Sequence, residues 1–132
     1  MTRIYLAGPL FTEAERRFNS ALCERLTAAG HDVYLPQRDA PAARGAGYPA
    51  RVFRANLDAL EQAQAVIAIC DGAAVDDGTA WEIGFAYARG VPVYGLRTDP
   101  RTVTAEERIN LTIEQGLTAL ATSVEELLAR LN

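Results

Sequence analysis

Short runs of apolar residues alternate along this chain with longer segments in which apolar positions recur every three or four residues. Runs of the first kind are typical of strands, and segments of the second kind are typical of amphipathic helices. The runs predict strands over residues 3–7, 32–35, 65–70, 91–96 and 117–121. The periodic segments predict helices over residues 12–29, 49–63, 78–89, 105–110 and 123–131.

Residues at the ends of these segments support the assignment. Thr12 and Ser123 are suited to cap the first and last helices, and Gly30 is suited to follow the first helix in a left-handed conformation. The stretch 36–48 contains two prolines and two glycines and is expected to be a loop. It is longer than most connections, and long loops in compact domains are often functional.

The alternation of strands and helices predicts an α/β fold, a three-layer sandwich of Rossmann-like type with a parallel five-stranded sheet. The apolar run 65–70 has the composition of a central strand that is buried on both faces. At 132 residues the chain is expected to form one domain, residues 1–132. Ligands of such sheets bind beyond the carboxyl ends of the strands, so candidate residues should follow each strand.

Composition removes several classes of function. The net charge of −4 argues against binding a nucleic-acid polymer. The chain has no lysine, which excludes Schiff-base chemistry and a P-loop, and a single histidine, His31, which makes a zinc site improbable. We expect no metal and no cofactor. No membrane-length apolar run or signal peptide is visible, and Cys23 and Cys70 are expected to be buried free thiols, so we expect a cytoplasmic protein with no membrane contact.

The segment 75–84 runs from a loop into a helix and carries the main candidate for chemistry. Either Asp76 or Asp77 is suited to cap this helix. Glu82 lies just over one turn into it, next to apolar residues, where partial loss of solvent would suit a nucleophile or general acid–base group. The alternative is a solvated glutamate with aspartates that serve only as caps. Gly84 favours the first reading, because glycine inside a helix usually marks close packing or a close ligand.

For two further side chains the sequence is compatible with either a structural or a functional role. Asn56 shares a helix face with Phe53 and Leu60, so it should point inward and needs a hydrogen-bond partner. That partner is either another protein group or a substrate. Tyr5, near the end of the first strand, is either an ordinary core residue or part of the site.

Four sequence elements together resemble the nucleoside 2-deoxyribosyltransferase family, in the right order and over nearly the whole chain. They are Ile4-Tyr5-Leu6-Ala7-Gly8-Pro9-Leu10-Phe11, Ala65-Val66-Ile67-Ala68, Asp76-x-Gly78-Thr79-x-x-Glu82-x-Gly84-x-Ala86 and Asn110-Leu111-Thr112-Ile113. The resemblance implies a flavodoxin-like fold and a double-displacement reaction. The residue matching Glu82 attacks C1′ of the deoxyribose, the base leaves, and a second base or water takes the sugar, by the logic of retaining glycosidases.

The resemblance also implies roles for other residues. Asp76 matches the residue that binds the 5′-hydroxyl and helps to protonate the base, and Tyr5 matches the tyrosine that orients the nucleophile. Asn56 falls where the family has Asp or Asn. Asn110 resembles an asparagine lent by a neighbouring subunit, which implies a homo-oligomer built from dimers, up to a hexamer. The remaining residues expected to contact 2-deoxynucleosides or free nucleobases are Gly8, Pro9, Phe11, Asp39, Gly78 and Thr79.

Three alternatives remain at this point. A sister group hydrolyses nucleoside 5′-monophosphates and tends to have serine where this chain has Asp76. An aspartate there would repel a phosphate but accept well from a hydroxyl, which favours free nucleosides. The second alternative is a non-catalytic module that senses nucleotides. The third is a phosphoacceptor receiver domain that uses Asp71, although such domains need a lysine.

Overall fold

The computed structural model describes residues 2–132 and contains a sheet of five parallel strands in the order β2-β1-β3-β4-β5. The order is that of flavodoxin-like folds, so the predicted fold class is confirmed. The strands are β1 (Arg3–Ala7), β2 (Asp32–Tyr34), β3 (Ala65–Ile69), β4 (Val93–Leu96) and β5 (Ala119–Ala121). The helices are α1 (Glu13–Ala28), α2 (Pro36–Asp39), α3 (Tyr48–Gln62), α4 (Asp77–Ala88), α5 (Leu111–Gly116) and α6 (Val124–Arg130).

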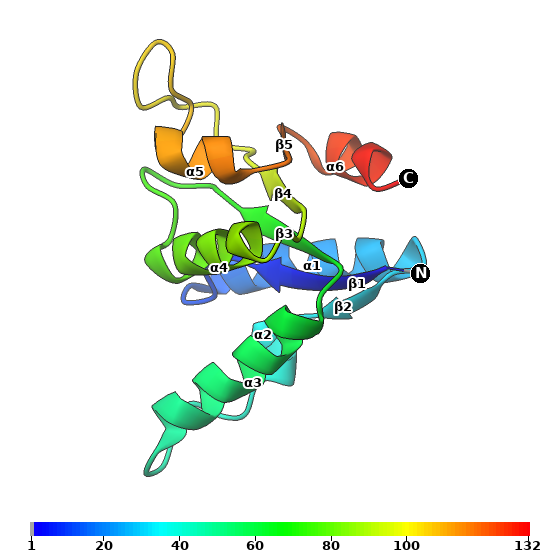
Figure 1. Ribbon diagram of the computed structural model, residues 1–132, viewed down its shortest axis with the longest axis vertical. Helices are drawn as coiled ribbons and strands as arrows, with labels where there is room; N and C mark the ends of the chain where they lie inside the picture. Colours follow the sequence, from blue (N-terminus) through cyan, green and yellow to red (C-terminus); the bar gives the residue numbers. More distant parts are fainter. Residues whose placement is uncertain (1) are drawn as a thin grey trace.

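Helices cover both faces of the sheet, as the alternating pattern predicts (Figure 1). On one face α1 and α6 pack through Leu22, Leu26 and Leu127 against alternate residues of the strands. On the other face α3 and α4 pack through Leu60 and Ile83, and α5 completes that layer. All five residues of β3 are buried, because this strand lies at the centre of the sheet with helices on either side.

The predicted helix ends agree with the structure where a cap residue identified them. Thr12 caps α1 in a full capping box with Glu15, and Gly30 follows that helix with φ of 95°. Ser123 caps α6 through the backbone N–H of Glu126. Cys23 and Cys70 are free and buried, as expected.

Two predictions of secondary structure are wrong. Residues 105–110 do not form a helix; instead Asn110 caps α5 by accepting from the backbone N–H groups of Thr112 and Ile113. Asparagine is poor inside helices and good at their start, so the cap outweighs the weak periodicity before it. The segment 36–48 is not all loop, since α2 occupies its first turn. Pro36 begins that turn and the Asp39 carboxylate accepts from the backbone N–H of Leu35.

Candidate active site

An open cleft of about 530 Å³ lies between α3 and α4, beyond the carboxyl end of β1. This volume is in the usual range for a site that binds a small molecule. Its location is where parallel α/β sheets bind ligands, next to the point at which the chain reverses its direction across the sheet. The residues that line the cleft are Tyr5, Gly8, Leu10, Phe11, Pro36, Phe53, Asn56, Leu57, Leu60, Asp76, Asp77, Gly78, Trp81 and Glu82.

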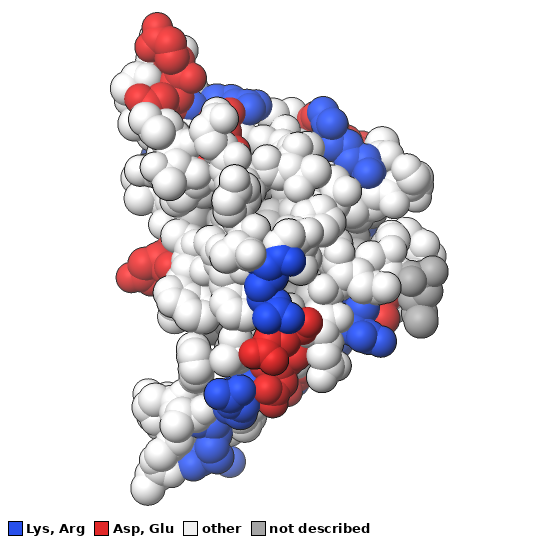
Figure 2. Space-filling view, viewed as in Figure 1, with Lys and Arg blue, Asp and Glu red and all other residues white. Residues whose placement is uncertain are grey.

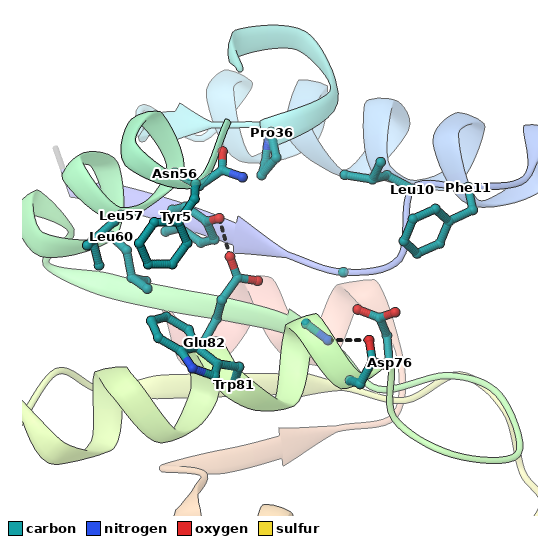
Figure 3. A pocket seen from close by; sticks show the side chains of 14 residues that line it. Tyr5, Leu10, Phe11, Pro36, Asn56, Leu57, Leu60, Asp76, Trp81 and Glu82 are labelled. Atoms are coloured by element: carbon teal, nitrogen blue, oxygen red, sulfur yellow. Dashed lines mark hydrogen bonds between the residues drawn. The ribbon is translucent and has the colours of Figure 1, made fainter. Parts of the chain in front are cut away.

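The position of Glu82 follows from how α4 packs on the sheet. Thr79, Ile83 and Ala86 are its buried residues, and their spacing forms one stripe that faces the sheet. Glu82 lies at the edge of this stripe, so its side chain extends along the sheet surface toward β1 rather than into water. Figure 3 shows the carboxylate reaching the centre of the cleft, where the hydroxyl of Tyr5 donates a hydrogen bond to Glu82 Oε2.

Burial changes the proton affinity of Glu82. Loss of solvent raises the pKa of this carboxyl to about 7, and the nearby charge of Asp76 adds to the rise, whereas the hydrogen bond from Tyr5 opposes it. The same burial, together with the Glu82 charge, raises the pKa of Tyr5 far above its ordinary value, so Tyr5 stays a donor. A carboxyl that titrates near neutrality in a cleft, held by one fixed donor, is suited to act as a nucleophile or as an acid–base group.

Asp76 is the N-cap of α4, as the sequence predicted for one of the two aspartates. One of its oxygens, Oδ2, accepts from the backbone N–H and from the hydroxyl of Thr79, both at 2.9 Å. Thr79 is buried and does not line the cleft, so its part in the site is to hold Asp76. Among residues 2–132 no group donates to Oδ1 of Asp76 within hydrogen-bonding distance, which leaves that oxygen free for a ligand.

Asn56 lies one turn before the buried Leu60 on α3, which turns it toward the cleft as expected. Its Oδ1 accepts from the hydroxyl of Tyr34 at 2.9 Å, so the inward amide has a protein partner and also borders the site. Phe53, assigned with Leu60 to one buried stripe, is instead half exposed at the rim of the cleft. The first half of α3 extends beyond the sheet (Figure 1), and Phe53 lies on this projecting part of the helix.

Other predicted site residues lie partly or wholly outside the cleft. The cleft is lined by Gly8, Phe11 and Gly78. Pro9 does not line it, and its carbonyl oxygen accepts a hydrogen bond from Asn19. Asp39 does not line the cleft, because both its oxygens hold Arg38 and the backbone of Leu35. Asn110 lies at the start of α5, is exposed, and does not line this cleft.

The side chains of Trp81, Phe53 and Tyr34 were not predicted as parts of the site. Trp81 packs edge to face on Phe53 at 5.9 Å and stacks on Phe85 at 5.6 Å, which joins α3 to α4 at the mouth of the cleft. Tyr34 stacks on Tyr5 with ring centroids 5.5 Å apart. Trp81 is adjacent to Glu82 in the sequence, and this adjacency was the available signal for it. Nothing in the local sequence around Tyr34 indicates that its ring lies against Tyr5.

The end of β3 does not offer a free phosphoacceptor. Asp71 accepts from the backbone N–H groups of Thr98 and Asp99 and from the hydroxyl of Thr98. Both of its oxygens therefore hold the loop after β4, which argues against the receiver alternative.

Among residues 2–132 no group of three or more side chains is arranged to hold a metal ion. Nor does the described part of the chain contain a helix with the length and hydropathy of a membrane span.

Comparison with known proteins agrees with this geometry. The family model for nucleoside 2-deoxyribosyltransferase matches residues 4–122. A conserved protein from Enterococcus faecalis V583 is similar with TM-score 0.84 and 32% identity, covering 98% of this chain and 96% of that one. A 2-deoxyribosyltransferase from Bacillus psychrosaccharolyticus is similar with TM-score 0.82 and 27% identity, covering 95% of this chain and 89% of that one.

One more distant structure shares the fold. A CMP N-glycosidase from Clostridium botulinum has TM-score 0.64 and 20% identity, covering 98% of this chain and 97% of that one. No curated protein sequence matches the chain.

Proposed function

The chain belongs to the nucleoside 2-deoxyribosyltransferase family, and on that premise we propose that it transfers 2-deoxyribose between nucleobases through an ester of Glu82. In the first step a Glu82 oxygen bonds to C1′ of a 2-deoxynucleoside and the C1′–N bond breaks. The bonding electrons go to the base, which takes up one proton and leaves. In the second step a nitrogen of another base attacks C1′ and gives up its own proton, which replaces the one taken by the first base, and the Glu82 carboxylate is released with net retention.

The contact of Tyr5 with Glu82 inside the cleft is the observation that carries this proposal. A nucleophile must be held in one orientation, and the donated hydrogen bond fixes one carboxylate oxygen while the other is left to attack. Because burial raises the pKa of Glu82 to about 7, the reactive carboxylate and the protonated acid are both populated near neutral pH. A 2-deoxy sugar suits such a site, since it lacks the 2′-hydroxyl that would destabilise a cationic C1′.

We assign Asp76 to the 5′-hydroxyl of the sugar, and to passing a proton from that hydroxyl or from solvent toward the leaving base, because the ionised carboxylate carries no proton of its own. Its Oδ2 is fixed by Thr79, and its carboxylate lines the same cleft as Glu82 (Figure 3). An ionised carboxylate accepts strongly from a hydroxyl and repels a phosphate, which favours free nucleosides. The aromatic rings of Phe11, Phe53 and Trp81 at the cleft mouth offer surfaces on which a flat base can stack.

Hydrolysis is the second candidate, because the cleft is open to water in the single chain and a glycosidase shares this fold. An exchange assay separates the two activities: a 2-deoxynucleoside is mixed with a different free base. A new nucleoside is the result expected for transfer, and free 2-deoxyribose alone is the result for hydrolysis. Binding without any product would instead favour a sensing module and overturn both catalytic proposals.

Substitution of Tyr5 by phenylalanine should move the pH dependence of the reaction. The hydrogen bond from Tyr5 lowers the pKa of Glu82, so its loss should raise that pKa further above 7. The acid limb of the kcat/KM profile, which reports the free enzyme, should shift to higher pH by about one unit. Tyr94→Phe is the matched control, since Tyr94 packs on the opposite face of the sheet. An unshifted limb in Tyr5→Phe would contradict the orienting role.

We also propose that two copies associate through the exposed faces of α3 and α4. Helix α4 is apolar on nearly all sides, yet Trp81 and Tyr87 are more than half exposed. Gly84 lies on this outer face, and a Cβ there would touch nothing within 4 Å, so the expected close packing is absent within the chain. Figure 2 shows few charged side chains over α4.

A homo-oligomer would cover this face, and Asn110, exposed at the start of α5, is our candidate for a residue that reaches a neighbouring site. Sedimentation is expected to give at least dimers for the native chain and a monomer for Tyr87→Arg. A native chain that sediments as a monomer at micromolar concentration would contradict this part of the proposal.

A further inference from the structure

Tyr34 connects two residues of the cleft without lining it. It ends β2, next to β1 in the sheet, and its ring stacks on Tyr5 with centroids 5.5 Å apart and planes 16° apart. Its hydroxyl reaches past that ring to α3 and donates to Asn56 Oδ1 at 2.9 Å. One side chain therefore touches both the tyrosine that holds Glu82 and the amide that faces Glu82 across the cleft.

The hydrogen bond from Tyr34 decides which end of the Asn56 amide faces the ligand. A primary amide has one oxygen that accepts and one nitrogen with two N–H groups that donate. With Oδ1 bound to Tyr34, Nδ2 is turned into the cleft, and Figure 3 shows it directed toward Pro36. Within residues 2–132 nothing accepts a hydrogen bond from Nδ2. The end of the Asn56 amide that faces the cleft therefore offers N–H donors to a ligand.

We propose that Tyr34 is a positioning residue, which locks the Asn56 amide with its N–H groups facing the cleft and so selects substrates that present a hydrogen-bond acceptor there. A nucleobase offers such an acceptor as a carbonyl oxygen or an unprotonated ring nitrogen. Without the hydroxyl the amide is free to turn over, and its oxygen would then repel the same acceptor. This inference rests on the proposed function in taking a nucleoside as the ligand.

A double-mutant cycle tests whether Tyr34 acts through Asn56. Tyr34→Phe keeps the ring that stacks on Tyr5 and removes only the hydroxyl. We expect it to lower kcat/KM about fivefold, which corresponds to the usual net free energy of one hydrogen bond. In an Asn56→Ala background the same change should have no further effect, because the group that it positions is gone. Equal losses in both backgrounds would overturn the inference, since Tyr34 would then act by packing alone.

The pH profile gives a second criterion that a packing defect would not satisfy. Tyr34→Phe leaves the hydroxyl of Tyr5 on Glu82, so the acid limb of kcat/KM should stay where it is in the native chain. A shift as large as that of Tyr5→Phe would show that Tyr34 acts through Tyr5 and would overturn the inference. Tyr94→Phe, which removes a hydroxyl elsewhere, is expected to match the native chain in both measurements.

Equilibrium binding separates failure of this inference from failure of the proposed function. The four common 2′-deoxynucleosides are titrated into the Glu82→Ala variant, with and without Tyr34→Phe and Asn56→Ala. A Kd about fivefold weaker on loss of the Tyr34 hydroxyl, only while Asn56 is present, would support the inference even if no exchange activity were found. A Kd that does not depend on the hydroxyl, or no binding of any of the four nucleosides, would overturn it.

Discussion

The Glu82→Ala variant is expected to lose turnover by a factor of at least about 10⁴, the scale on which removal of a catalytic nucleophile acts. The physical reason is that no other carboxylate in the cleft receives the Tyr5 hydroxyl, so no other group is held ready to attack C1′. The measurement is single-turnover release of free base from a 2-deoxynucleoside. Glu24→Ala is the control, because Glu24 is an exposed glutamate of α1 on the far side of the sheet. Native turnover in Glu82→Ala would rule out the covalent mechanism.

The neutral variant Glu82→Gln should be inactive and also more stable than the native chain at alkaline pH. Burial raises the pKa of Glu82 from 4.5 to about 7, so ionising it costs the folded state more than the unfolded chain. Stability is therefore lost as the pH rises between these two values, by up to about 3 kcal/mol. Glutamine carries no charge, so the free energy of unfolding should exceed that of the native chain by about 2 kcal/mol more at pH 8 than at pH 5.

Denaturant titrations at these two pH values measure this difference and show that the variant is folded. A gain that is equal at both pH values would mean that the Glu82 carboxylate is well solvated, which would remove the basis for its raised pKa.

The Asp76→Ser variant is expected to have the second largest effect. Serine is also a good N-cap, so α4 should keep its start, while the carboxylate assigned to the 5′-hydroxyl is lost. We expect kcat/KM for 2-deoxynucleosides to fall between about tenfold and a hundredfold, the weight of a hydrogen bond to a charged group. For 5′-monophosphates kcat/KM should rise, because the N-terminus of a helix without its own carboxylate attracts phosphate.

The neighbouring Asp77 provides the control for Asp76. It also lines the cleft, but its side chain is bound to the backbone N–H of Gly78 and it does not hold Thr79. Asp77→Ser removes the same charge one residue away. If both variants change the preference between nucleoside and monophosphate equally, the effect is general electrostatics, and the assignment of Asp76 to the 5′-hydroxyl fails.

Local sequence signals predicted the features that depend on local interactions. The periodicity of the helices, the buried run at β3 and the caps at Thr12 and Ser123 each arise from contacts within a few residues. The same holds for Asp76 as the cap of α4. The helix predicted over 105–110 failed, because its periodicity was weak and the capping asparagine at its end begins the next helix instead. Local patterns are reliable where spacing and cap chemistry agree, and here they disagreed.

The sequence by itself determined the α/β architecture and pointed to Glu82, because strand and helix periodicity and a carboxylate in a capped, apolar segment are properties of neighbouring residues. The tertiary structure alone decided that Tyr5 donates to Glu82, that Tyr34 fixes the Asn56 amide, and that Asp39 is occupied by Arg38 and stands outside the cleft. The reason is distance along the chain. Tyr5 and Glu82 are 77 residues apart, and only the parallel register of β1 with β3 and the packing of α4 on the sheet bring their side chains together.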